Sequence, residues 1–295
     1  MPEFRLSSPD LEVRVSTRFA AILACNALID GSRQPLLRPA SPDAAGTATA
    51  AGCFPLVPFG NRLAGNQFSF EGRSYRVEPN AGDPCRLHGD GWLAEWQMAE
   101  ATPRRVNFRL DVAASDASPY AYEAHQIVAV EAGSLEVALT VTNRGERLPF
   151  GLGLHPYFAL TPQTTLLAPA ADYWLEGAGY LPTQRSGLPV DLDFSRPRAL
   201  PDSWINNGFE GWSGDAEIRW PERRFGVRIA ADRLFRRFVL FQLNASFDPT
   251  WTRDWFCFEP MSHSPAAHRL ADLGGLVPLG TNETLAGMVR FEILH

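Results

Sequence analysis

Alternation of apolar and polar residues with a period of two is the strongest pattern in this chain of 295 residues. Apolar side chains take every second position in residues 106–112, 225–229 and 289–293. Successive side chains of a strand point to opposite faces of a sheet, so this period predicts strands that bury one face. Because the pattern recurs along most of the sequence, we expect an all-β chain built as a large antiparallel β-sandwich.

The connections between the alternating runs support the same fold. Residues 122–143 are expected to form a hairpin, since Gly133 lies in a short connection between two alternating runs. Only residues 266–276 have a hint of helical spacing, which ends at two glycines. Residues 38–52 and 161–201 are rich in proline and poor in alternation, and we expect both to be loops. Neither resembles a linker, so a single domain spanning residues 1–295 is predicted.

Composition excludes several classes of partner. The net charge is −6 and no run of basic residues occurs, which argues against binding to nucleic acid or to an anionic membrane. The longest apolar run, residues 19–29, is too short to cross a bilayer. Residues 1–5 do not begin a secretory signal, so a cytoplasmic location is predicted.

Cofactor motifs are missing from the sequence. The four cysteines, at positions 25, 53, 85 and 257, do not form a Cys-x-x-Cys motif. We expect them to be buried apolar residues, not disulfides or zinc ligands. We find no HExxH, no P-loop, no GxGxxG before a helix and no GxSxG. The sequence therefore predicts neither a metal nor an organic cofactor.

Two short clusters have compositions unlike those of plain strands. Asn61 and Arg62 follow a Pro-Phe-Gly segment, and a guanidinium held in such a turn suits oxygen ligands. The alternative is a turn arginine paired with a surface carboxylate. His88 precedes a Gly-Asp-Gly turn and Trp92, which offers a stacking face. Here the alternative is a surface histidine in a hairpin turn.

Two further clusters contain groups that can exchange protons. His155 stands among apolar and aromatic residues beside Pro156 and Tyr157, where a buried histidine of the core is the alternative. Glu259 ends an almost wholly apolar segment, so it needs either a partner or a raised pKa if it is buried. A glutamate in that setting is a candidate general base, unless it simply ends the strand in solvent.

These clusters together resemble the aldose 1-epimerase (galactose mutarotase) family. Members of that family show four short motifs in a fixed order, and this sequence has all four, as Asn61-Arg62, His88-Gly89, His155-Pro156-Tyr157-Phe158 and Glu259-Pro260. The resemblance extends from about Gly60 to the C-terminus and implies a galactose mutarotase-like supersandwich. It also implies interconversion of the α and β anomers of a sugar substrate, without a cofactor.

The resemblance assigns roles at the matching positions. It implies that His155 is the general acid at the ring oxygen and that Glu259 is the base at the anomeric hydroxyl. It further implies that Arg62 and His88 hold sugar hydroxyls, with Asn61 beside them. Aromatic residues, among which Trp92, Trp212 and Tyr157 are candidates, could stack on the sugar.

One position departs from the family pattern. Where the family often has a sugar-binding aspartate, shortly before a Phe-x-Gly segment, this sequence has Asn206. An amide donates as well as accepts hydrogen bonds, so the preferred sugar could differ from galactose or glucose.

Two other functions are compatible with the sequence. The first is a mutarotase of a hexose phosphate or another anionic sugar, for which Arg62, Arg86 and Arg185 are possible donors. The second is a non-catalytic sugar-binding module, which would have no need of the His155 and Glu259 pair. The sequence leaves the protein as a monomer or a homodimer.

Overall fold

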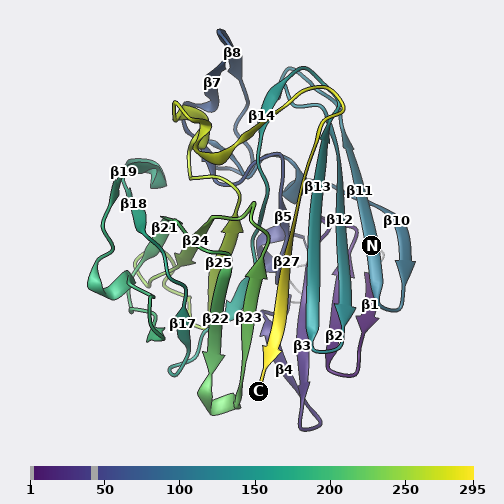
Figure 1. Cartoon of the computed structure of the whole chain (residues 1–295), viewed down its shortest axis with the longest axis vertical. Helices are drawn as coiled ribbons and strands as arrows, with labels where there is room; N and C mark the ends of the chain where they lie inside the picture. Colours follow the sequence, from purple (N-terminus) through teal and green to yellow (C-terminus); the bar gives the residue numbers. More distant parts are fainter. Residues whose placement is uncertain (1–2, 41–45) are drawn as a thin grey trace.

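The computed structural model describes residues 3–40 and 46–295, and nearly all of its regular structure is β-strand (Figure 1). Two large antiparallel sheets lie face to face and enclose one apolar core. Contacts between Phe158 and Phe291, and between Phe4 and Phe108, connect the two sheets. The prediction of an all-β antiparallel sandwich is therefore confirmed.

The first sheet contains twelve strands among the described residues. Ten of them follow each other in the order β1 (Glu3–Ser7), β2 (Leu11–Ser16), β3 (Ile22–Ile29), β4 (Ser32–Leu37), β16 (Tyr157–Ala159), β25 (Trp255–Met261), β24 (Arg237–Gln242), β21 (Ile205–Glu210), β18 (Asp172–Glu176) and β19 (Pro182–Ser186). The short strands β15 (Gly153–Leu154) and β5 (Pro55–Leu56) pair beside β25.

The second sheet contains nine strands in the same described part of the chain. Their order is β10 (Gln97–Thr102), β11 (Arg105–Val112), β12 (Tyr122–Glu131), β13 (Ser134–Asn143), β27 (Thr284–Leu294), β23 (Phe225–Ala231), β22 (Asp215–Trp220), β17 (Thr165–Leu167) and β20 (Arg198–Ala199). The expected hairpin over residues 122–143 is confirmed as β12 and β13, whose residues alternate between buried and half-buried.

Smaller elements complete the fold at its periphery. Three two-stranded sheets are formed by β6 (Arg62–Leu63) with β9 (Arg86–Leu87), β7 (Gln67–Phe70) with β8 (Arg73–Arg76), and β14 (Leu148–Phe150) with β26 (Val277–Leu279). Single 3₁₀ turns are η2 (Ala48–Ala50), η3 (Ala64–Asn66), η4 (Gly91–Leu93), η5 (Ala178–Tyr180), η6 (Val190–Leu192), η7 (Pro221–Arg223), η8 (Ala267–Arg269) and η9 (Leu273–Gly275).

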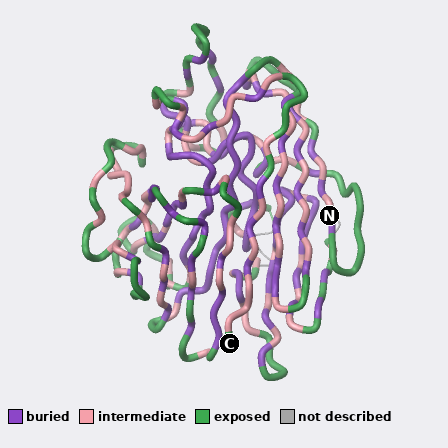
Figure 2. Tube along the Cα trace, in the orientation of Figure 1, coloured by how far each residue is buried: buried purple, intermediate pink, exposed green. Residues whose placement is uncertain are grey.

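Burial follows the two-layer arrangement. Figure 2 shows that the central strands are buried along much of their length, whereas exposed residues gather at the connecting loops. All four cysteines are free and buried, as expected for apolar residues outside a disulfide framework. Among the described residues, no helix combines the length and the hydrophobicity that crossing a membrane requires.

The expectations for three segments need correction or completion. Residues 161–201 contain β17, β18, β19 and β20 and are not a plain loop. Every residue of β18 is half-buried, because this strand lies near the end of its sheet, and so the segment lacks the alternation that marks a strand. Residues 266–276 form only η8 and η9, since Ala266 and Leu273 have positive φ angles that interrupt a helix.

Part of the predicted loop over residues 38–52 is buried and packs against the rest of the protein. Residues 41–45 lie outside the described part of the chain. In the remainder, Ala48 and Ala51 are buried in a small apolar cluster with Phe54 and Tyr157. This segment therefore packs against the face of the first sheet on which the histidine and glutamate clusters lie.

Candidate active site

A cavity of about 160 Å³ opens on the face of the first sheet around β21, β24 and β25. It brings together all the site residues expected from the sequence except Trp212: Asn61, Arg62, His88, Trp92, His155, Tyr157, Asn206 and Glu259. Residues from five separate stretches of the chain thus meet at one place, which the sequence could propose but not establish.

Strand register explains why His155 and Glu259 face each other. Gly153 pairs with Met261, and Tyr157 pairs with Cys257, in the same antiparallel register. Extending that register places His155 directly opposite Glu259. Pro156 has no N–H to donate to the ladder, but the side chains of His155 and Tyr157 remain on one face because alternation continues across this position.

The two side chains form a close, buried pair. His155 Nε2 lies 3.2 Å from Glu259 Oε1, and the two residues are 6% and 3% exposed. Burial raises the pKa of Glu259 well above its ordinary value, although the positive charge of Arg62 partly opposes this. Burial also lowers the pKa of His155. At a pH between these two pKa values, the two side chains share one exchangeable proton. The partner that holds it is an acid and the other partner is a base.

Aromatic packing holds the imidazole of His155 in place. Its ring centre lies 4.6 Å from that of Phe54 and 4.9 Å from that of Tyr157, with interplanar angles of 23° and 26°. The guanidinium of Arg38 lies over the ring of Tyr157, 3.8 Å from its centre. Nδ1 of His155 has no hydrogen-bond partner in the described part of the chain, so Nε2 is the nitrogen that exchanges a proton with Glu259.

His88 presents a hydrogen-bond donor to the cavity. Its Nδ1 accepts the N–H of Asn61 at 2.9 Å, which leaves the proton of the neutral ring on Nε2. Burial, and the proximity of His155, lower the pKa of His88 well below its ordinary value and keep it neutral. Both Asn61 and His88 have positive φ angles, a strained conformation that the surrounding contacts maintain at this position.

Arg62 is a fixed cation at the edge of the cavity. Its Nε and Nη2 both lie 2.9 Å from Asp83 Oδ2, and its guanidinium lies 5.2 Å from the centre of the Tyr180 ring. The carboxylate partner is mostly buried and not on the surface, so Arg62 is a positioned group and not a loose turn arginine.

Asn206 faces the cavity, and its amide is oriented by a neighbour. Its Nδ2 donates to one oxygen of Glu176, whose other oxygen accepts the indole N–H of Trp204 at 3.0 Å. Because the nitrogen of the amide is engaged in this way, the oxygen of Asn206 is left to accept a hydrogen bond. The site thus has acceptor character where the family pattern has an aspartate.

Trp212 is not part of the cavity, contrary to the expectation. It is 0% exposed, packs edge-on against Phe238 and Phe258, and donates its indole N–H to Asp215 O at 2.7 Å. It lies just after β21, where the chain has passed from the cavity into the sandwich core. The other two stacking candidates, Trp92 and Tyr157, do line the cavity.

The additional arginines proposed for an anionic sugar do not line the cavity. Arg86 pairs with Asp90, and Arg185 pairs with Asp172. Of the three candidates, only Arg62 lines the cavity. Thr49 and Phe241 also line the cavity, and Glu176 contacts Asn206. The sequence did not indicate these three residues, because their contacts with the site arise only when the chain folds.

One group of side chains has the composition of a metal site. Ligand atoms of His155, Cys257 and Glu259 lie within 4.8 Å of one another. Cys257 and Glu259 are two residues apart on β25 and therefore share a face. These donors suit a thiophilic divalent ion, but such an ion would occupy the pair that exchanges the proton.

Comparison with known proteins agrees with the arrangement. A sequence model of the family described as aldose 1-epimerase matches residues 2–286. The uncharacterized protein YphB of Escherichia coli K12 is 42% identical over 262 residues, which cover 88% of this chain and 89% of YphB. A crystal structure from Escherichia coli K12, named as a candidate aldose 1-epimerase, superimposes with a TM-score of 0.93 at 38% identity and covers 99% of this chain and 98% of that one. A GalM/aldose epimerase homologue from C. elegans shares the fold, with a TM-score of 0.82 at 16% identity over 100% of this chain and 99% of that one.

Proposed function

The chain belongs to the aldose 1-epimerase family, and on that premise we propose that it interconverts the α and β anomers of a free aldose. The contact between His155 and Glu259 is the observation that supports this proposal most directly. Opening a hemiacetal removes a proton from the anomeric hydroxyl and adds one to the ring oxygen. A buried pair that holds a single proton supplies both groups.

In the proposed reaction, Glu259 takes the proton of the anomeric hydroxyl while His155 protonates the ring oxygen. The C–O bond of the ring breaks, and an open-chain aldehyde forms. After rotation about the C1–C2 bond, the ring oxygen attacks the other face of the aldehyde. His155 then recovers its proton from that oxygen, and Glu259 returns a proton to the new anomeric hydroxyl. The pair ends with the same single proton with which it began.

Burial influences which partner holds that proton. In the empty cavity, the raised pKa of Glu259 and the lowered pKa of His155 favour the proton on Glu259. Transfer across 3.2 Å gives the state in which Glu259 is the base, and the positive charge of Arg62 favours that state. Pyranose hydroxyls bound in the cavity would also favour it, by donating to the carboxylate.

The remaining cavity residues suit neutral hydroxyl groups. His88 donates from Nε2, Arg62 donates from its guanidinium, and Asn206 accepts. A sugar phosphate is less suited, because Arg86 and Arg185 have carboxylate partners outside the cavity. We therefore favour a free sugar over an anionic one, and an enzyme over a binding module that would not need the proton-exchanging pair.

The test is anomer exchange followed by NMR on glucose, galactose and glucose 6-phosphate. Glu259→Gln removes the base but keeps the shape of the side chain, and we expect a loss of at least roughly 100-fold in kcat. Glu131→Gln makes the same chemical change at an exposed strand end and serves as the matched control. Full activity of the Glu259→Gln variant, or faster exchange with the phosphate than with glucose, would contradict the proposal.

A further inference from the structure

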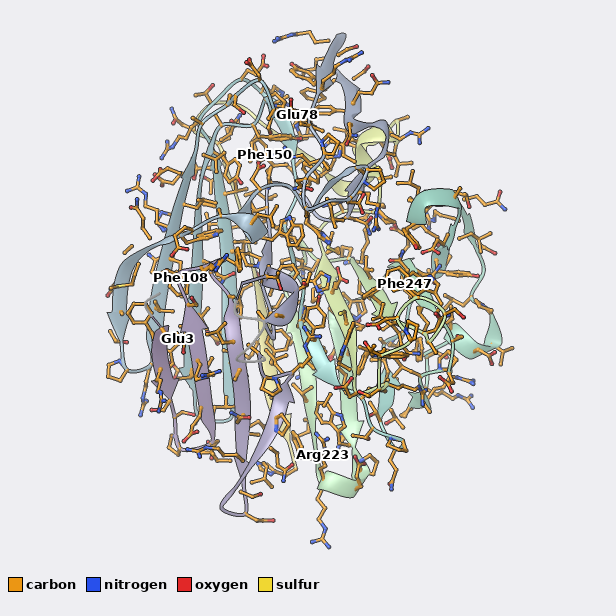
Figure 3. The ribbon with its side chains drawn as sticks, turned by 180° about the vertical axis from the view of Figure 1, so that it is seen from behind. Glu3, Glu78, Phe108, Phe150, Arg223 and Phe247 are labelled. Carbon is orange, nitrogen blue, oxygen red and sulfur yellow. The ribbon has the colours of Figure 1, made fainter. Side chains whose placement is uncertain are left out.

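Three aromatic side chains form a partly exposed surface beside the cavity, here called the rim platform: Tyr180, Trp204 and Phe247. The ring centres of Trp204 and Phe247 are 4.9 Å apart, those of Tyr180 and Trp204 are 5.5 Å apart, and those of Tyr180 and Phe247 are 6.0 Å apart. Tyr180 is 40% exposed and Phe247 is 52% exposed. Phe247 is labelled in Figure 3. Large aromatic side chains that remain exposed together are a feature of binding surfaces.

The rim platform is continuous with the cavity. Trp204 packs edge-on against Phe241 at 5.6 Å, and Phe241 lines the cavity. Tyr180 lies under the guanidinium of Arg62, which also lines it. Trp204 and Asn206 are two residues apart where β21 begins, so both side chains project from the same face of the sheet.

One carboxylate connects the platform to the cavity. Glu176 accepts hydrogen bonds from the indole of Trp204 and from the amide of Asn206. Each carboxylate oxygen can accept more than one hydrogen bond, so Glu176 retains capacity for a ligand hydroxyl. Its negative charge disfavours an anion at this position.

The chemistry of the site determines which part of a sugar reaches the rim. The anomeric carbon and the ring oxygen must lie against His155 and Glu259, which are only 6% and 3% exposed. The opposite side of the sugar ring then points toward the mouth. With about 160 Å³ available, the cavity has room for one ring, so any group attached to the far side lies on the rim platform.

We propose that the rim platform is a subsite for the second, uncharged ring of a reducing disaccharide whose reducing ring occupies the cavity. A pyranose has an apolar C–H face that suits a partly exposed aromatic surface, and its hydroxyls suit the free acceptor capacity of Glu176. This inference rests on the proposed function, because the orientation of the first ring follows from the epimerase reaction.

Calorimetry with the full-length protein tests the subsite directly. Glucose and galactose are compared with maltose, cellobiose and 4-galactobiose. We expect at least one disaccharide to bind about five-fold or more tightly than its own reducing monosaccharide. Phe247→Ala and Tyr180→Ala should each remove most of this gain and leave monosaccharide binding unchanged. Met98→Ala is the matched control: Met98 is 43% exposed on β10, on the opposite side of the molecule from β18 and β19 (Figure 1).

Two results would overturn the subsite. One is that no disaccharide binds more tightly than its reducing monosaccharide, and the other is that the gain persists in both platform variants. Anomer exchange measured by NMR on the same sugars separates this failure from failure of the proposed function. Exchange that is equally fast on monosaccharides and disaccharides, and insensitive to the platform variants, rejects the subsite alone. Platform-dependent binding without accelerated exchange supports the subsite and rejects the epimerase reaction.

Discussion

Replacing Asn206 with aspartate restores the residue type that the family often has at this position, yet we expect it to impair this protein. In the wild type, the amide nitrogen of Asn206 donates to Glu176. In Asn206→Asp, a carboxylate oxygen takes the place of that donor, and two carboxylates face each other. Glu176 cannot easily turn away, because Trp204 holds its other oxygen at 3.0 Å.

The size of the effect follows from the contact. Two unit charges about 4 Å apart repel by about 4 kcal/mol at an effective dielectric constant of about 20. Binding a proton would avoid the repulsion, but at pH 7 and an ordinary carboxyl pKa of about 4 it costs about 4 kcal/mol, as much as the repulsion itself. Partial rotation of the side chains is therefore what lowers the penalty at this pH. We therefore expect about 1.5–3 kcal/mol at pH 7, equivalent to a roughly 10- to 100-fold lower kcat/KM.

The assay is anomer exchange on the best substrate, run on Asn206→Asp, Glu176→Gln and the double variant. In the double variant, the amide introduced at position 176 can donate to the carboxylate introduced at position 206, which reverses the direction of the hydrogen bond and removes the repulsion. Its kcat/KM should recover to within a few-fold of wild type. The single Asn206→Asp variant should also gain activity relative to wild type as the pH falls, since a proton then binds the carboxylate pair.

Two outcomes would refute this reasoning. If Asn206→Asp is as active as wild type at pH 7, then Glu176 does not determine the orientation of the amide. If the double variant is no better than the single variant, the defect has a cause other than repulsion between the two carboxylates. A double-variant cycle separates these cases because it measures the coupling between the two positions.

Two further predictions concern stability. Trp212→Phe should lower the free energy of unfolding by about 1–3 kcal/mol, because the carbonyl of Asp215 loses its buried donor, while KM stays within about two-fold of wild type. Thermal unfolding and steady-state kinetics measure these two quantities, and a large rise in KM would mean that Trp212 contacts the sugar after all. Glu259→Gln should become more stable than wild type as the pH rises above about 4.5. The raised pKa of buried Glu259 means that the folded protein binds more protons than the unfolded chain between the ordinary and the raised pKa, so wild type loses stability over that window by up to about 1.4 kcal/mol per pH unit. Chemical denaturation at pH 4.5 and pH 7 measures the difference, and an equal effect at the two pH values would contradict it.

Strand periodicity predicted the regular interior of the fold because those strands bury one face completely. Residues 106–110 and the hairpin over 122–143 behave in this way, with buried and half-buried positions in alternation. The strands within residues 161–201 escaped prediction because they lie toward the ends of their sheets, where β18 buries neither face fully. A pattern that reflects burial cannot mark strands that lack a buried face.

The sequence predicted site residues whose burial has a high free-energy cost. It did not predict residues whose role depends on a partner far away along the chain. Glu259 was identifiable because a carboxylate within an apolar strand needs compensation. Trp212 was assigned wrongly, because the sequence does not distinguish an indole that fills the core from one that faces a cavity. Glu176 and Arg38 went unnoticed since their significance comes from Asn206 and Tyr157, which are far away along the chain.

Because β15 and β16 pair with β25 in one common register, the number of residues in these strands cannot change by one without moving a side chain to the other face. His155 and Glu259 meet because each lies two positions from the paired residues on either side of it. Deleting or inserting one residue between Cys257 and Glu259 would turn the carboxylate to the opposite side of the sheet, even if every other residue were retained. Length changes in the outer loops carry no such penalty. Variation in length among related chains should therefore be confined to the loops, with residues 153–157 and 257–261 kept free of insertions and deletions.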